Sequence, residues 1–297
     1  MKKLLSIVVF VLCSSSALAT DMLSFIAPEG TITKYQSATN IDFTIPKYTS
    51  SNSDGSKADV SIGNRIQQNL DGYKLEIVDD FTDTVGTFAD NPDLMVSTEG
   101  NRKLNTSALG ATTSIEVPYR CETVYQSDGT ITFGKFVYDT SFLKDPYASI
   151  FQAQQSIEEK NRNARIARLY GLDLELGQEV ALPPVKGLGE LDPDINLTST
   201  YKFAGRDADN YFLFDVSAQS SLVSKTINQY GTKIFFKLMP GSGTGKISFT
   251  EDGRLLHEEY QQVTNVVYTY IFVIGKITST YRFEGTISFE RQVDMVE

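Results

Sequence analysis

The chain has 297 residues, of which 41% are hydrophobic and 22% are charged, a composition typical of a globular protein with a sizeable core. It contains no Trp but 15 Tyr and 18 Phe, and aromatic side chains favour β-strands. The formal net charge of −10 argues against nucleic acid as a partner. It argues equally against electrostatic docking on anionic lipid.

The first 19 residues have the pattern of a cleavable secretory leader. Lys2 and Lys3 form a positive segment, Leu4 to Leu12 form an apolar one, and Ala17 to Ala19 form a small-residue cleavage motif. The apolar run is too short to span a bilayer, so no transmembrane span is expected after the leader is removed. We therefore expect cleavage after Ala19 and a bacterial protein that is periplasmic or secreted. Loss of the two lysines changes its net charge to −12.

The two cysteines bear on lipidation and on disulfide formation. Cys13 would become the acylated N-terminus of a lipoprotein, but such sites carry a small residue where this chain has Leu12. If Cys13 leaves with the leader, Cys121 is the only mature cysteine, and an intramolecular disulfide is excluded. Cys121 shares an apolar strand face with Val117 and Tyr119, which favours a buried thiol over a nucleophile.

Residues 20–142 are predicted to form an N-terminal β-rich half. Apolar residues alternate with polar ones at positions 41–45, 73–77 and 115–121, which is the two-residue period of a strand. Pro46 is expected to end the first of these strands. Pro118 indicates that the third is an edge strand or contains a bulge, because proline has no N–H to donate.

One segment departs from the β pattern. Asp145 followed by Pro146 fits the start of a helix. Apolar residues then recur at helical spacing as far as Tyr170, and Gly171 is a natural stop. The sequence therefore predicts a helix over 143–171, either a single one of about 25 residues or two shorter ones.

Residues 172–297 are predicted to form a C-terminal antiparallel β half. Between 276 and 290 every second residue faces a dry side, with a bend at Gly285. The eight residues from Thr198 match the eight from Thr278 at six positions, which indicates either two strands of one sheet or a duplicated unit. Ser127-Asp128-Gly129 and Glu251-Asp252-Gly253 predict hairpin turns. The predicted fold class is mainly β (α+β), a curved, half-barrel-like antiparallel sheet or sheets with one long helix packed on it.

Motifs that carry catalytic or cofactor chemistry are incomplete in this chain. Gly241 to Lys246 looks like a phosphate-binding loop, but Pro240 and Ile247 break the pattern and a strand follows, so a glycine-rich hairpin loop is expected. His257 is the only histidine and is expected on a solvent-exposed face, which leaves no Ser-His-Asp triad and no usual zinc ligands. No catalytic residue, metal or cofactor is predicted.

Two clusters of acidic residues could bind a cation or simply face solvent. Asp192, Asp194 and Asn196 have the opening spacing of a calcium loop, but Leu197 stands where such a loop needs Gly. Asp207 and Asp209 follow Gly205 in a predicted turn. Both groups are interpreted as solvated loops.

The stretch GTGKISFTEDGRLLHEEY, from Gly243 to Tyr260, resembles a hairpin near the end of some bacterial secreted proteins. Those proteins are similar to the lipoprotein-carrier (LolA-like) superfamily, and the likeness extends from about Gly187 to the C-terminus. The resemblance implies an antiparallel sheet curved over a helix, with a concave apolar surface that could hold acyl chains. It brings no catalytic residues with it.

The sequence thus favours a non-enzymatic periplasmic or secreted protein that binds an apolar ligand or lipid on a concave sheet face. The candidate ligand-binding residues are those of the dry strand faces: Tyr201, Phe203, Tyr281, Phe283, Ile287 and Phe289. The simpler interpretation of that face is ordinary core beneath the helix. An envelope structural or assembly factor that binds other proteins through sheet edges is the alternative. A secreted hydrolase using carboxylates is the third hypothesis.

Overall fold

The computed structural model describes residues 21–88, 91–108, 110–126, 130–145, 147–149, 151–152, 155, 169–182, 184–186, 196–229 and 232–296. The predicted leader and most of the predicted helix over 143–171 lie outside these residues. The helix with defined bounds is α1 (Val60–Leu70). The strands are β1 (Asp21–Met22), β2 (Ile32–Asn52), β3 (Lys74–Phe88), β4 (Asn91–Ala108), β5 (Ala111–Tyr125), β6 (Ile131–Phe133), β7 (Val137–Tyr138), β8 (Asp173–Leu174), β9 (Glu179–Ala181), β10 (Val185–Lys186), β11 (Asn196–Arg206), β12 (Phe212–Ser220), β13 (Val223–Gln229), β14 (Thr232–Leu238), β15 (Gly241–Phe249), β16 (Leu255–Ile274) and β17 (Ile277–Met295).

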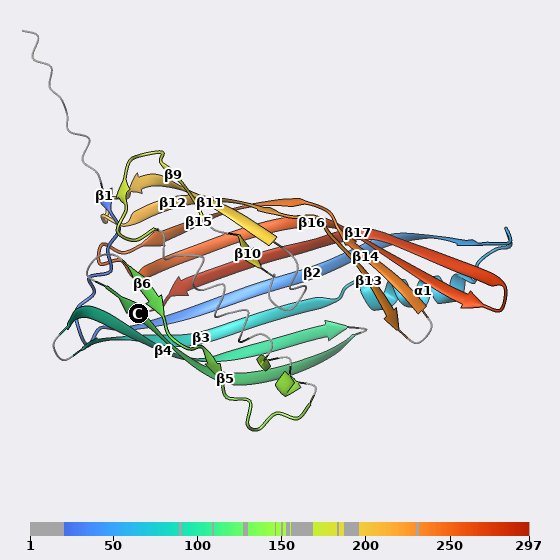
Figure 1. The fold of residues 1–297 in the computed structure, drawn as a ribbon, viewed down its shortest axis with the longest axis horizontal. Coiled ribbons are helices and arrows are strands. Elements are labelled where there is room, and N and C mark those ends of the chain that lie inside the picture. The colour runs from blue at the N-terminus through green and yellow to red at the C-terminus, as the bar shows by residue number, and fades with distance from the viewer. Residues whose placement is uncertain are drawn as a thin grey trace, which may run out of the picture.

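Fifteen of these strands form one antiparallel sheet, in the order β10-β11-β12-β15-β16-β17-β2-β3-β4-β5-β6 (Figure 1). Strands β7, β9, β13 and β14 pair onto this path, and β1 pairs with β8 separately. At the centre of the sheet, β2 from the N-terminal half pairs with β17 from the C-terminal half. The pairing runs from Tyr35 opposite Met295 to Asn52 opposite Ser279. The N-terminal and C-terminal β halves therefore contribute to the same sheet.

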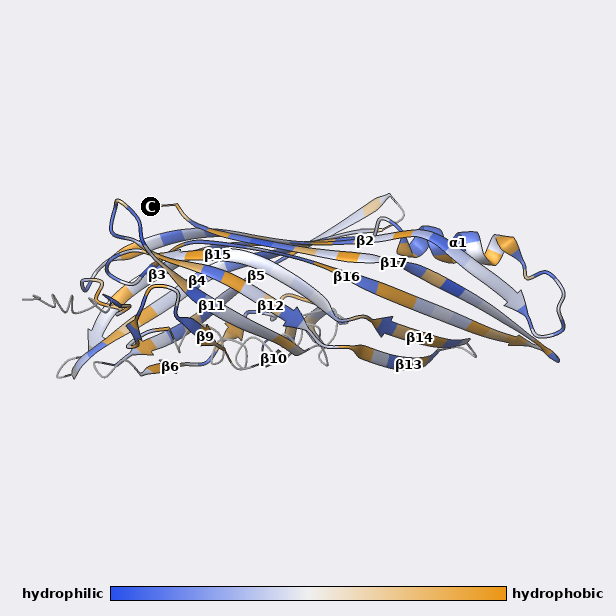
Figure 2. Cartoon of the chain, turned by 90° about the horizontal axis from the view of Figure 1, so that it is seen from above, coloured by the Kyte–Doolittle hydropathy of each residue, from blue (hydrophilic) through white to orange (hydrophobic). Residues whose placement is uncertain are grey.

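The sheet is curved but is not closed into a barrel. Seen from the edge, the long strands β16, β17 and β2 form one layer (Figure 2). Strands β9 to β11 belong to one end of the strand order and β6 belongs to the other end. Both groups lie on the same side of that layer, as expected for a curved sheet. The prediction of a mostly β protein with a large antiparallel sheet is confirmed.

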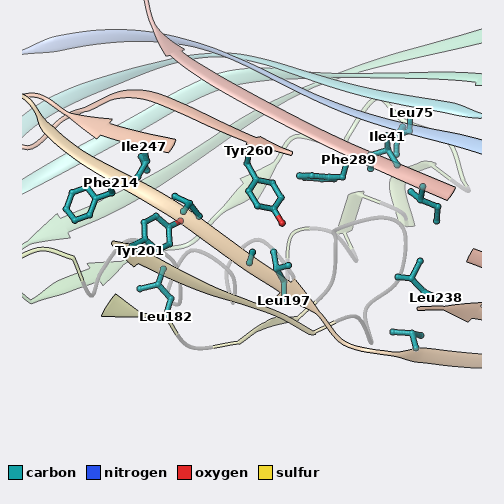
Figure 3. Packing of buried hydrophobic residues seen from close by; sticks show 14 of the residues in the cluster. Ile41, Leu75, Leu182, Leu197, Tyr201, Phe214, Leu238, Ile247, Tyr260 and Phe289 are labelled. Atoms are coloured by element: carbon teal, nitrogen blue, oxygen red, sulfur yellow. The ribbon is translucent and has the colours of Figure 1, made fainter. Parts of the chain in front are cut away.

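The alternation predicted for the strands is present in the structure. On β17 the side chains of Tyr281, Phe283, Ile287 and Phe289 are buried while their polar neighbours are not. The apolar residues of β2, β3, β11, β12 and β15 face the same core (Figure 3). Each strand thus buries one face, which is why antiparallel sheets of this kind show a two-residue period in sequence.

Pro46 does not end its strand as predicted. Strand β2 continues to Asn52, and Ile45 and Pro46 together lie opposite the single residue Gly285 of β17. This is a β-bulge, which removes the need for an N–H at the proline. The backbone of Ile45 is satisfied by side chains instead, since its N–H donates to Asp71 Oδ1 and its carbonyl accepts from Gln67 Nε2, both at 2.8 Å. The bulge lies opposite Gly285, the residue at which the sequence predicts a bend of the strand.

The prediction of one long helix is wrong for the part of the chain that the structure describes. There, helical residues occur in two short stretches: α1, and a group between 147 and 155. Residues 169–171 form a turn. Within the described residues, no helix is long and apolar enough to cross a membrane.

Helix α1 was missed by the sequence prediction although it carries a start signal. The Asp59 carboxylate accepts a hydrogen bond from the backbone N–H of Ser61 at 2.8 Å, as an N-cap does. Gly63 weakens the helix prediction because glycine has a low helix propensity. It is required for packing, since a Cβ there would lie 2.2 Å from the ring of Tyr48. The helix lies against the end of β2 (Figure 1).

The glycine-rich run from Gly241 is strand β15 and not the hairpin loop that was expected. Its glycines make room for the neighbouring strand β16, since a Cβ on Gly243 would lie 2.1 Å from the hydroxyl of Tyr260. The turn at Glu251-Asp252-Gly253 is confirmed, with the Thr250 N–H donating to Arg254 O at 2.9 Å. The turn at 127–129 lies outside the described residues, but its flanking strands β5 and β6 pair as predicted.

Candidate ligand-binding cavity

A cavity of about 310 Å³ lies on the inner side of the curved sheet. Its walls come from β2 to β6 of the N-terminal half and from β11, β15, β16 and β17 of the C-terminal half. The volume corresponds to about ten water molecules. It is at the small end of the range for ligand sites in proteins.

Strand register builds the polar part of the cavity. Ser37 of β2 lies opposite Asp79 of β3, and Asp79 lies opposite Arg102 of β4. The Arg102 guanidinium binds the Asp79 carboxylate through two bonds, Nε to Oδ1 at 2.6 Å and Nη2 to Oδ2 at 2.8 Å. Both side chains are almost fully buried, so this ion pair lies in a low-dielectric environment.

Aromatic side chains surround the Arg102 guanidinium. It lies 5.6 Å from the ring centroids of both Tyr119 and Tyr138, and it donates a hydrogen bond to the Tyr138 hydroxyl. The small residue Gly100 allows this arrangement, because a Cβ there would lie 2.6 Å from Phe81 and 2.9 Å from Tyr119. The charge is therefore held in place by a carboxylate on one side and by ring faces on the other.

Two further arginines line the cavity from the C-terminal half. Arg254 Nη1 donates to Thr33 Oγ1 at 3.0 Å, while its Nε binds the Asp252 carboxylate. Burial alone would raise the pKa of Asp252, but hydrogen bonds from Arg254 and Thr250 outweigh it and hold that pKa below its usual value. Arg291 lies 3.3 Å from Glu258.

The ionisable lining of the cavity is balanced in sign. Its acids are Asp79, Asp83 and Glu258, and its bases are Arg102, Arg254 and Arg291. The Asp83 carboxylate accepts from Thr98 Oγ1 at 2.6 Å. A cavity of this kind suits a ligand whose polar group is uncharged or zwitterionic, since a net charge on the ligand would meet no excess of opposite charge.

The remaining lining is aromatic and aliphatic. Tyr35 stacks on Phe81 with centroids 4.9 Å apart, and Phe25 stacks on Tyr125 at 4.0 Å. Burial, with a smaller contribution from the Asp83 charge, raises the pKa of Tyr35 far above its usual value. Its hydroxyl therefore stays protonated and is able to donate a hydrogen bond.

Only two of the six candidate ligand-binding residues line this cavity, namely Tyr201 and Phe289. Ile287 is buried in the core. Phe203 packs against Phe212 and Phe214 in the C-terminal strands.

The last two candidate residues, Tyr281 and Phe283, lie at the α1 end of the sheet. Tyr281 donates its hydroxyl hydrogen to the carbonyl of Asp59 at 3.0 Å. Phe283 contacts Tyr48, with ring centroids 5.2 Å apart. Both side chains are fully buried.

The other side chains considered from sequence are accounted for in the structure. His257 Nδ1 lies 2.6 Å from Asp294 Oδ1 with the ring partly exposed, and Cys121 is buried as predicted. The Asp207 carboxylate accepts from the backbone N–H groups of Asp209 and Tyr211, which confirms the turn.

Asp192 and Asp194, the start of the calcium-loop spacing, lie outside the described residues. Among the residues that are described, no group of three or more His, Cys, Asp or Glu side chains is placed to hold a metal ion.

A scan of the chain against protein-family models found no match. Searches of curated proteins and of solved structures found none either. A functional assignment therefore depends on the fold and on the cavity.

Proposed function

We propose that the protein is a non-enzymatic binding protein, periplasmic or secreted after loss of residues 1–19, that holds a small amphiphilic molecule inside its curved sheet. The observation that carries this proposal is the cavity of about 310 Å³, with aromatic walls at one part and the ion pairs Asp79–Arg102 and Glu258–Arg291 at another. Such mixed lining is typical of small-molecule sites, where a few polar groups fix the orientation of a mostly apolar ligand.

The geometry also limits the class of ligand. A volume of about ten water molecules is too small for a whole two-chain lipid. The balanced lining favours a polar group without net charge, which would accept from Tyr35 or the arginines and donate to the carboxylates. The expected resemblance of the C-terminal part to secreted proteins that are similar to lipoprotein carriers would imply an apolar component in the ligand.

A cavity-filling substitution tests the proposal. Thr39 lines the cavity and is buried, so Thr39→Phe would occupy part of its volume. Thr84→Phe is the matched control, because Thr84 is exposed on the outer face of β3. The probe is N-phenyl-naphthylamine, a neutral amphiphile that fluoresces when it leaves water.

We expect saturable fluorescence with the unmodified protein and with Thr84→Phe, and at least about a tenfold weaker affinity with Thr39→Phe, equivalent to about 1.4 kcal/mol. Thermal unfolding of all three proteins checks that each is folded. Absence of probe binding to the unmodified protein, or equal loss in both variants, would contradict the proposal.

A further inference from the structure

At the end of the sheet next to α1, two hairpins extend beyond the cavity-bearing part (Figure 1). Strand β14 pairs with β13 and with the outer half of β16, from Leu238 opposite Val266 to Thr232 opposite Phe272. The outer halves of β16 and β17 pair as far as Ile274 and Ile277. We call residues 223–229, 232–238 and 262–283 the arm.

The arm is basic although the protein is acidic. The chain contains 37 acidic residues, yet none lies between 216 and 250 or between 260 and 283. The arm carries five cations: Lys225, Lys233, Lys237, Lys276 and Arg282.

Three acidic residues border the arm, and one of them is paired with a cation of the arm. Glu284 accepts a hydrogen bond from Arg282 Nε at 2.8 Å. Asp54 and Asp59, in the connection from β2 to α1, accept hydrogen bonds from Ser56 and Ser61. Those serine hydrogen bonds do not neutralise Asp54 and Asp59. The lysines of the arm, with Lys57 of the same connection, outnumber these two carboxylates, so the charge at this end of the sheet is positive.

Aliphatic side chains lie between these cations. On β16 the outer positions hold Val263, Val267, Ile271 and Val273, and Val263 and Val273 are 60% and 63% exposed. Figure 2 shows this apolar character along the outer half of β16. Lys237 lies opposite Val267 and Lys233 lies opposite Ile271 on the neighbouring strand, so cations flank the aliphatic stripe.

We propose that the arm docks on the surface of an anionic lipid bilayer, with its lysines against lipid phosphates and its tip, at Val273 and Ile277, inserted among the headgroups. Basic side chains and apolar side chains each bind such a surface weakly, and stable attachment needs both. An extended tip with exposed aliphatics suits a fluid bilayer better than a protein surface, which requires a broad complementary patch.

The net negative charge of the whole chain does not prevent this docking. From Glu259 to Val273 the strand spans about 48 Å at about 3.4 Å per residue. The Debye length is about 10 Å at 0.1 M salt, so Glu259 and the acids beyond it are screened from a membrane at the tip. Asp54 is nearer, since the N–H of Ser53 donates to Thr278 O at 2.9 Å, but the lysines outnumber the acids at this end. The net charge of the whole chain predicts no docking on anionic lipid, but this prediction does not extend to the arm, where the charge is locally positive. This inference is independent of the cavity and its ligand.

A single-tryptophan probe tests insertion of the tip, because the chain has no Trp of its own. Val273→Trp places an indole at the tip, and Leu176→Trp, at a residue that is 78% exposed near the cavity end, is the matched control. Each variant is mixed with phosphatidylcholine vesicles that contain or lack phosphatidylglycerol. We expect a blue shift of emission only for Val273→Trp with the anionic vesicles, reversed by salt. No shift, or the same shift in the control, would overturn the proposal.

A charge variant tests the lysines separately. The double variant Lys233→Gln with Lys237→Gln is compared with Lys34→Gln with Lys103→Gln, which removes the same charge from exposed positions of β2 and β4. Each lysine near an anionic surface contributes about fivefold in affinity, so the arm variant is expected to bind these vesicles about 30-fold more weakly. The control pair is expected to bind like the unmodified protein, and equal losses in the two pairs would refute the assignment.

Discussion

The side chains around the cavity point to the inner face of the sheet, as the alternation of their strands requires, but several of them are polar where the inner face is otherwise apolar. Ser37, Asp79, Thr98 and Arg102 all occupy inner-face positions that an apolar residue would normally fill. A polar residue at such a position was the available sequence signal for the site. That signal is weak, because a single polar residue on an apolar strand face matches no known motif and its partners are up to 65 residues away in sequence.

Breaking the buried ion pair is expected to destabilise the protein strongly. Arg102→Met leaves the Asp79 carboxylate buried without its cation, which costs about 3–5 kcal/mol in the free energy of unfolding. The double variant Asp79→Leu with Arg102→Met removes both charges and is expected to be clearly more stable than the single one. Urea unfolding of the three proteins measures the difference. A single variant as stable as the unmodified protein would show that the pair is not desolvated.

At the scale of strands, the two-residue period predicted that several of the long strands exist. The short turns between neighbouring strands predicted which of them pair as hairpins. The alternating runs of β2, β3, β5 and β17 and the β15–β16 hairpin were all predicted from sequence. Pairings between distant segments were not, since nothing local in β2 indicates that β17 is its neighbour. Strand ends were also missed where a tertiary contact overrides a local signal, as the bulge opposite Gly285 does for Pro46.

The approach of β15 to β16 depends on glycine. Gly245→Ala would place a Cβ 2.1 Å from the backbone oxygen of Glu259, which cannot move aside as a side chain would. We expect it to cost about 1–3 kcal/mol in unfolding free energy. Gly86→Ala is the matched control, because its nearest neighbours lie 3.8 Å from the added carbon and the substitution is expected to be neutral or slightly stabilising. Similar thermal shifts in the two variants would contradict the packing described for β15.

At the scale of the whole molecule, the curved sheet divides into a cavity-bearing part and an arm. The antiparallel sheet could be predicted from sequence, because its alternation runs through both halves. The six residues proposed from the dry strand faces are all buried, yet four of them belong to the core and two line the cavity. Burial of a face can be predicted from its period, whereas an unfilled volume depends on how distant strands pack.

Buried tyrosines predict an upper pH limit for the fold. Burial, as the main cause, raises the pKa of Tyr35, Tyr170 and Tyr268 above the usual value near 10. Because the folded-state pKa is the higher one, their contribution to stability is complete below about pH 10 and is lost as the pH rises above it. A tyrosinate absorbance titration, run beside circular dichroism, is expected to show part of the 15 tyrosines ionising only as the sheet unfolds. Ionisation of all of them before any loss of strand signal would contradict this burial.

The most direct test of the central claim, that the cavity of the curved sheet holds a small amphiphile, is native mass spectrometry of the protein purified from its source without detergent. The account predicts a stoichiometric adduct of small-molecule mass on the unmodified protein and on Thr84→Phe, with little or none on Thr39→Phe. A bare protein mass in all three, or an adduct of equal abundance in all three, would contradict it.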